Sequence, residues 1–133
     1  MIRVGIDIYE KVVTIKSKII KTFTIKKVEN LGYSGGFVAS KKTRVGIVPL
    51  GYADGINRAL KNKAFVRING ELCRIIGNVC MDVFFVDLNG VQAKIFDEVV
   101  VFENALEWAK LCHTIPYEIL TNLNFSRMEK VVF

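Results

Sequence analysis

Apolar and polar residues alternate along the first quarter of the chain. Between residues 13 and 25, one parity is apolar at most positions, and the other parity carries mainly Lys and Thr. A period of two residues predicts a strand with one buried face and one solvated face. Lys21 falls on the apolar parity, so we expect a bulge or a strand end close to it.

Shorter apolar runs follow, separated by turn residues. The runs cover residues 44–50, 64–68, 72–76, 83–88 and 98–102. Asn69-Gly70 between two of them predicts a hairpin, because both residues accept the positive φ angles of a tight turn. Asn89-Gly90 follows residues 83–88 and predicts a second hairpin. Residues 33–36, Tyr-Ser-Gly-Gly, are predicted to form a loop.

The pattern changes towards the C-terminus. Asn104 and Glu107 have the spacing of a capping box, and the residues after Asn104 favour a helix. Thr114-Ile115-Pro116 predicts the start of a second short helix over residues 117–123, and residues 131–133 can form a last strand. The chain is therefore predicted to be one mainly β domain, residues 1–133, with a short helical pair near its end.

The composition is apolar for a free-standing domain of this size. Hydrophobic residues make up 51% of the 133 residues, and the mean hydropathy is +0.32. Either a small β-rich fold or a large face buried against another body would account for this. No apolar run approaches the roughly 20 residues that span a bilayer, and the N-terminus carries no secretory pattern. We expect a cytoplasmic protein without a membrane partner.

Cysteines and charge narrow the classes further. Cys73, Cys80 and Cys112 are odd in number and lack CxxC spacing, so reduced thiols are expected and neither a disulfide framework nor a metal site is. The net charge of +6 could attract nucleic acid or another anion. Lys16 and Lys18, however, alternate with apolar residues, which is typical of the solvated face of a strand.

Few residues indicate chemistry on their own. The chain has one His, His113, in a predicted helix, where a packing or surface role is more common than catalysis. Asp54, Asp82, Asp87 and Asp97 lie near turns, where carboxylates often bind local backbone amides. Gly51-Tyr52-Ala53-Asp54-Gly55 is more informative, because small residues beside Tyr52 leave its phenol exposed on a turn.

Six segments, taken together and in order, resemble the C-terminal domain of pyridoxal-phosphate-dependent alanine racemase. They are Arg3-Val4-Gly5-Ile6 with Tyr9, Leu31-Gly32-Tyr33-Ser34, residues 48–55 with Arg58, residues 77–82, residues 117–120, and Ser126-Arg127. They span almost the whole chain. The resemblance implies a β-barrel-like fold, interconversion of L-alanine and D-alanine, and supply of D-alanine for peptidoglycan.

The resemblance also implies roles for particular residues. Tyr52 is expected to be one of two opposed catalytic acid/base groups, and the backbone amide of Met81 to hold the substrate carboxylate. The pyridoxal 5'-phosphate (PLP) cofactor is expected to contact Arg3 at its ring nitrogen. Its phosphate is expected to meet the amides of Gly5 and Ile6 and the hydroxyl of Tyr117.

Two departures from the family pattern bear on function. Asn78 stands where the family usually has an Arg towards the substrate entrance. Nothing resembles the family's N-terminal (β/α)₈ barrel, where the Schiff-base lysine is expected. We therefore expect the chain alone to be inactive, and to work with an N-terminal barrel domain of the same protein in a homodimer.

Three other interpretations remain open. One is a racemase for serine or a broader set of amino acids. A second is a small basic β-domain that binds nucleic acid, for which Phe65-Val66-Arg67 is the best patch, although it is a poor one. The third is a non-catalytic remnant that dimerises or binds a partner through an apolar face.

Overall fold

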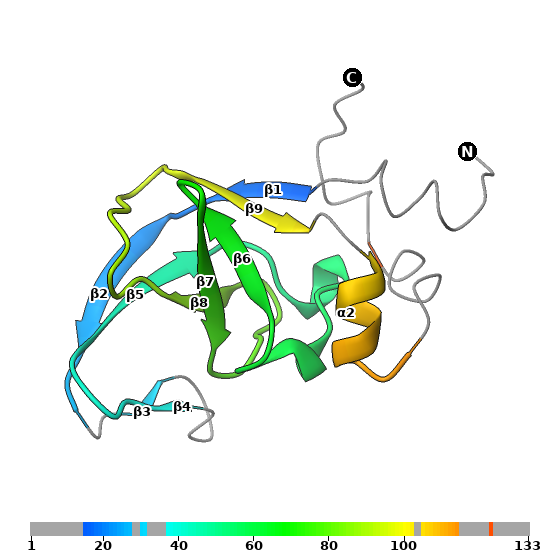
Figure 1. Cartoon of the computed structure of the whole chain (residues 1–133), viewed down its shortest axis with the longest axis horizontal. Helices are drawn as coiled ribbons and strands as arrows, with labels where there is room; N and C mark the ends of the chain where they lie inside the picture. The colour runs from blue at the N-terminus through cyan, green and yellow to red at the C-terminus, as the bar shows by residue number, and fades with distance from the viewer. Residues whose placement is uncertain (1–14, 28–29, 32–36, 103–104, 115–122, 124–133) are drawn as a thin grey trace.

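The computed structural model describes residues 15–27, 30–31, 37–102, 105–114 and 123 of the chain. Strands dominate this part (Figure 1). They are β1 (Ile15–Lys18), β2 (Lys21–Ile25), β3 (Asn30–Leu31), β4 (Phe37–Val38), β5 (Thr43–Val48), β6 (Phe65–Ile68), β7 (Glu71–Ile76), β8 (Phe84–Asp87) and β9 (Glu98–Phe102). Two 3₁₀ turns, η2 (Tyr52–Asp54) and η3 (Arg58–Leu60), and one helix, α2 (Ala105–Leu111), complete the described elements.

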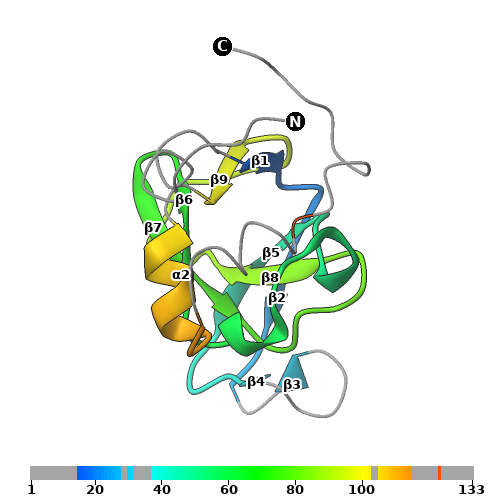
Figure 2. The ribbon, with the colours of Figure 1, turned by 90° about the vertical axis from the view of Figure 1, so that its right-hand side faces the viewer.

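The main sheet is antiparallel and closes on itself through one bent segment. Its strand order is β1-β9-β6-β7-β8-β5-β2, so the two ends of the order are consecutive in sequence. The Ile19 N–H still donates to Asp97 O on the β9 side (3.1 Å), whereas the Ile20 N–H donates to Ile47 O of β5 (3.0 Å). The chain therefore passes from one sheet edge to the other at a single peptide, and the strands enclose an interior (Figure 2).

This closure confirms the barrel-like, mainly β fold and corrects one element. The predicted strand over residues 13–25 is two strands with a break at Ile19-Ile20, next to Lys21, where a strand end was expected. Residues 13 and 14 lie outside the described residues. Lys16 and Lys18 are exposed, which confirms the interpretation of both as solvent-facing. Lys21 and Lys26 are exposed as well.

One of the two predicted hairpins forms. Asn69 and Gly70 have φ angles of 51° and 81°, and they join β6 to β7 with Ile68 opposite Glu71. The expectation of a second hairpin at Asn89-Gly90 is wrong, because β8 pairs with β5 and β7, while β9 pairs with β1 and β6. Of these two residues only Gly90 has a positive φ, 77°, and the chain then crosses to the far side of the barrel.

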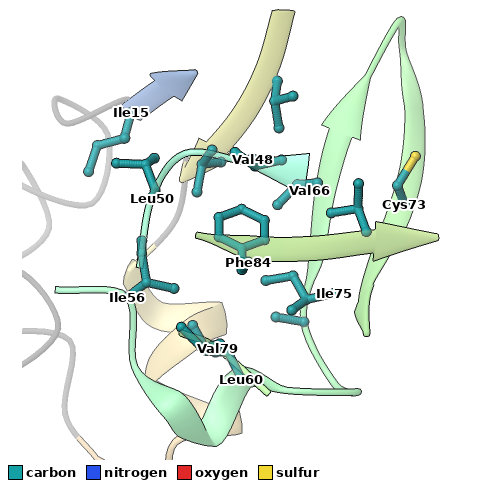
Figure 3. Packing of buried hydrophobic residues seen from close by; sticks show 14 of the residues in the cluster. Ile15, Val48, Leu50, Ile56, Leu60, Val66, Cys73, Ile75, Val79 and Phe84 are labelled. Atoms are coloured by element: carbon teal, nitrogen blue, oxygen red, sulfur yellow. The ribbon is translucent and has the colours of Figure 1, made fainter. Parts of the chain in front are cut away.

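Phe84 of β8 lies at the centre of the core, with no exposed surface (Figure 3). The cluster around it draws on every strand of the sheet except β2, together with η3, α2 and Ile56 between the two 3₁₀ turns. Its fully buried members include Ile19, Val48, Ile56, Leu60, Ile68, Ile75 and Val86. Buried residues alternate with exposed ones in β6 and with partly buried ones in β8, as an antiparallel barrel with one face towards the core requires.

The predicted first helix is confirmed as α2, which lies against η3. It ends in a left-handed cap at His113 (φ 55°), where the Thr114 N–H donates to Ala109 O (2.9 Å). His113 is exposed just beyond the helix, as a surface residue. The predicted loop at 33–36, the cap residue Asn104 and the last strand fall outside the described residues, and so does the second helix apart from Leu123, which is buried.

Two further findings concern the whole described part. Cys73, Cys80 and Cys112 form no disulfide with one another. Within the described ranges, no helix has the length and apolar character needed to cross a membrane.

Candidate active site

The register of β5 and β8 brings two loops to the same end of the barrel. Val48, the last residue of β5, lies opposite Phe84, the first residue of β8. The segment that follows β5 and the segment that precedes β8 therefore leave the sheet side by side. These are the two segments that carry Tyr52 and Met81.

Direct backbone contacts then join the two segments. The Tyr52 N–H donates to Cys80 O (2.9 Å), and the Ala53 N–H donates to Met81 O (3.1 Å). A Cβ atom at Gly51 would lie 2.2 Å from Cys80 O and 2.4 Å from the Met81 carbonyl carbon. Gly51 is thus required by close approach of the two backbones, since its φ of −148° is open to any residue.

Contacts within the Tyr52 loop hold its backbone conformation. Asp54 is 4% exposed, and its Oδ2 accepts the Gly51 N–H (2.9 Å), so this carboxylate binds a local amide as expected. Gly55 ends the 3₁₀ turn at φ 100°, a conformation that favours glycine. Both features fix the backbone on either side of Tyr52.

Tyr52 itself faces solvent, as predicted. Its side chain is 47% exposed, and its hydroxyl makes no hydrogen bond within the described part of the chain. The Arg58 guanidinium lies 5.8 Å from the centre of the ring. A cation over an exposed aromatic face is worth about 0.5–1 kcal/mol, enough to bias the orientation of the ring.

Met81 presents an unused backbone donor beside Tyr52. Its carbonyl accepts from Ala53, and the neighbouring Cys80 N–H donates to Val83 O (2.9 Å). The Met81 N–H has no acceptor among the residues that the structure describes, and the residue is 51% exposed. An exposed amide without a partner, held in a fixed turn, can bind a carboxylate.

Two contacts that the sequence did not indicate hold the start of this segment. The Lys61 ammonium donates to Asn78 Oδ1 (3.1 Å), so a cation lies beside the position where the resemblance implied an Arg. The Gly77 N–H donates to Asn62 Oδ1 (2.9 Å). The only sequence signal for Asn62 was its residue type, since Asn is enriched in left-handed turns.

The other predicted site residues are not placed. Arg3, Gly5, Ile6 and Tyr117, the expected PLP contacts, lie outside the described residues. Within the described ranges, no group of three or more His, Cys, Asp or Glu side chains could hold a metal ion.

Comparison with known proteins decides the family. The family model for the alanine racemase C-terminal domain matches residues 12–132. The chain belongs to this family. The alanine racemase of Helicobacter pylori (strain Shi470) is 44% identical in an alignment 131 residues long, which covers 93% of this chain. That of Aquifex aeolicus is 34% identical in a gapped alignment 146 residues long, which covers 98% of this chain.

Solved structures confirm the fold of this domain. Alanine racemase from Acinetobacter baumannii superposes with a TM-score of 0.79 at 34% identity over 84% of the chain. The Bartonella henselae enzyme, with covalently bound pyridoxal phosphate, gives 0.80 at 28% identity, also over 84%. The chain spans 34% of the H. pylori relative, 43% of the A. aeolicus relative and 32% of either solved chain.

Proposed function

We propose that the protein containing this domain interconverts L-alanine and D-alanine with PLP, and that this chain supplies part of the substrate site. Relatives that cover more than nine-tenths of the chain are named alanine racemase. One structural neighbour holds covalently bound pyridoxal phosphate, and another, from Bacillus anthracis, holds L-Ala-P. PLP, when bound, withdraws electrons from the α-carbon and so makes the α-proton removable.

The paired loops are the observation that carries this proposal. Met81 is half exposed, its N–H has no acceptor among the described residues, and this N–H binds the substrate carboxylate. The Tyr52 phenol is exposed on the segment hydrogen-bonded to Met81, so it is presented on the same face of the domain. It acts there as the acid/base for one face of the α-carbon, while a second base serves the other face. That role of Tyr52 remains a prediction from the resemblance, as do the PLP contacts of Arg3, Gly5, Ile6 and Tyr117.

The remaining parts of the proposal concern the whole enzyme. The chain spans about a third of its H. pylori relative, so we expect it to be inactive alone and to work with an N-terminal barrel domain that carries the Schiff-base lysine. We further propose a homodimer in the cytoplasm that makes D-alanine for peptidoglycan. The apolar composition fits a domain that buries part of its surface against these partners.

Tyr52→Phe in the PLP-loaded complete enzyme tests the catalytic assignment. We expect turnover to fall roughly 10²–10⁴-fold, the usual worth of a general acid/base. Exchange of the α-proton with solvent deuterium separates a base from a residue that only positions substrate. With one base lost, one enantiomer still exchanges its proton without racemising, because the opposite base is intact.

Tyr33→Phe is the matched comparison, because Tyr33 is the other tyrosine that the sequence predicts in a glycine-containing loop, Gly32-Tyr33-Ser34-Gly35. A collapse of turnover in Tyr52→Phe, with exchange retained in one enantiomer, supports the assignment. Near-normal turnover in Tyr52→Phe removes Tyr52 from the chemistry. If Tyr33→Phe then shows the one-sided exchange, the acid/base group lies on that loop, and Tyr52 only lines the approach.

No finding supports the other interpretations. Every relative and neighbour compared above is an alanine racemase, which favours neither serine nor nucleic acid. The best nucleic-acid patch is also poorly suited to stacking, because the Arg74 guanidinium already lies 5.6 Å from the centre of the Phe65 ring.

A further inference from the structure

The Met81 amide owes its position to its surroundings, because it makes no hydrogen bond of its own within the described chain. On its C-terminal side, the Cys80–Val83 turn and the contacts of Tyr52 and Ala53 hold the segment. On its N-terminal side, the segment begins at Gly77, directly after β7. What fixes Gly77 therefore sets where the Met81 N–H points.

Asn62 is the side chain that holds Gly77. Its Oδ1 accepts the Gly77 N–H at 2.9 Å, in a partly buried contact across 15 residues of sequence. Asn62 has a left-handed backbone, φ 57°, and so does Gly77, φ 72°. An Asn serves both needs at this position, since it tolerates the left-handed region and offers a side-chain acceptor.

Apolar packing also holds the start of the 77–83 segment. Leu60, at the end of η3, and Val79, two residues after Gly77, both belong to the buried cluster (Figure 3). Lys61 adds an exposed hydrogen bond to Asn78 (3.1 Å). Exposed contacts of this kind contribute little, because water competes for both partners. Of these two contacts, the partly buried one of Asn62 is the stronger.

We propose that Asn62 is a positioning residue for substrate, acting through Gly77 on the Met81 amide. This inference rests on the proposed function, in which that amide binds the substrate carboxylate. Loss of the Asn62 acceptor frees the start of the 77–83 segment and widens the range of Met81 N–H orientations. The carboxylate is then held less well, while the acid/base groups remain in place.

The test uses three variants of the PLP-loaded complete enzyme. Asn62→Gly removes the acceptor but keeps a residue at ease with φ 57°. Asn62→Asp keeps both an acceptor and tolerance of that φ. Asn89→Gly is the matched control, because Asn89 Oδ1 also accepts a backbone N–H at 2.9 Å, that of Arg44, across 45 residues and away from the site.

We expect Asn62→Gly to raise KM for alanine roughly tenfold, with kcat changed less than about threefold. Asn62→Asp keeps KM at the wild-type value. Asn89→Gly also leaves KM unchanged, although it lowers the free energy of unfolding in urea by about as much as Asn62→Gly does. Propionate, which is alanine without its amino group, tests binding in the absence of turnover. Its Kd, measured by calorimetry, should rise in Asn62→Gly and stay unchanged in Asn62→Asp and Asn89→Gly. An unchanged KM and propionate Kd in Asn62→Gly, or an equal rise in Asn89→Gly, overturns the inference.

The two proposals fail separately. A wild-type enzyme that does not racemise alanine refutes the proposed function before any variant is made. A wild-type enzyme that does racemise, with Asn62→Gly indistinguishable from it, refutes only the role of Asn62.

Discussion

Gly51→Ala is the sharpest perturbation that the structure offers. The new Cβ would meet Cys80 O at 2.2 Å and the Met81 carbonyl carbon at 2.4 Å, and these atoms belong to backbone. Ordinary contact begins at 3.4 Å, so the two loops must separate by about 1 Å. The backbone conformation of Gly51, φ −148°, adds no strain, so the effect comes from this contact alone.

The magnitude follows from what that separation breaks. The hydrogen bonds from Tyr52 N–H (2.9 Å) and Ala53 N–H (3.1 Å) lengthen beyond useful range. Two such bonds are worth about 2 kcal/mol of unfolding free energy. A displacement of about 1 Å at a catalytic group lowers kcat/KM by roughly 100-fold. We expect both effects in Gly51→Ala, measured by urea unfolding of the chain and by steady-state kinetics of the complete enzyme.

Gly90→Ala is the control for a glycine replaced elsewhere. Its Cβ would meet no atom within 4 Å, but its φ of +77° imposes a left-handed strain of about 1–2 kcal/mol. The control should lose comparable stability and keep the wild-type kcat/KM. A Gly51→Ala enzyme that folds with unchanged kcat/KM would refute the claim that the Gly51 contact aligns the site.

The core and the buried thiol give two further predictions. Phe84→Ala removes the central core side chain and should lower the unfolding free energy in urea by about 3–5 kcal/mol. Phe96→Ala is the control and should change this free energy little, because Phe96 is 72% exposed. Equal losses in the two variants would contradict the assigned core. Burial, with smaller contributions from Asp87 and Glu71, raises the pKa of the Cys73 thiol from 9.0 to about 11. Because the unfolded thiol ionises first, stability should fall as pH rises from about 9 to 11, and a Cys73→Ala chain with the same pH slope would refute this.

Local sequence signals predicted local geometry well. Asn69-Gly70 encodes its own turn, because both residues tolerate positive φ, and the strands on either side are adjacent in sequence. Asn89-Gly90 is the same dipeptide, but it forms no hairpin because β8 already has β5 and β7 as neighbours. Pairing between distant strands decides such a case, and a two-residue signal contains no information on it.

The sequence likewise indicated only part of how the barrel closes. Alternation showed that residues 15–25 are extended, and the misplaced Lys21 marked a break. β1 and β2 join opposite edges of the sheet, because Ile19 bonds to Asp97 and Ile20 bonds to Ile47. Both partners lie more than 25 residues away along the chain. No pattern within the segment could have supplied those partners.

The site shows the same division between local and distant information. The motifs identified Tyr52 and Met81 as members of one site, but only the fold shows why Gly51 must be a glycine and how Asn62 reaches Gly77. Both features arise where two loops from different strands meet, at the Val48–Phe84 end of the barrel. The described loops on this face are held mainly by backbone contacts and by Asn and Asp side chains. Substitutions at these contacts should therefore change substrate positioning before they change the chemistry of any reacting group.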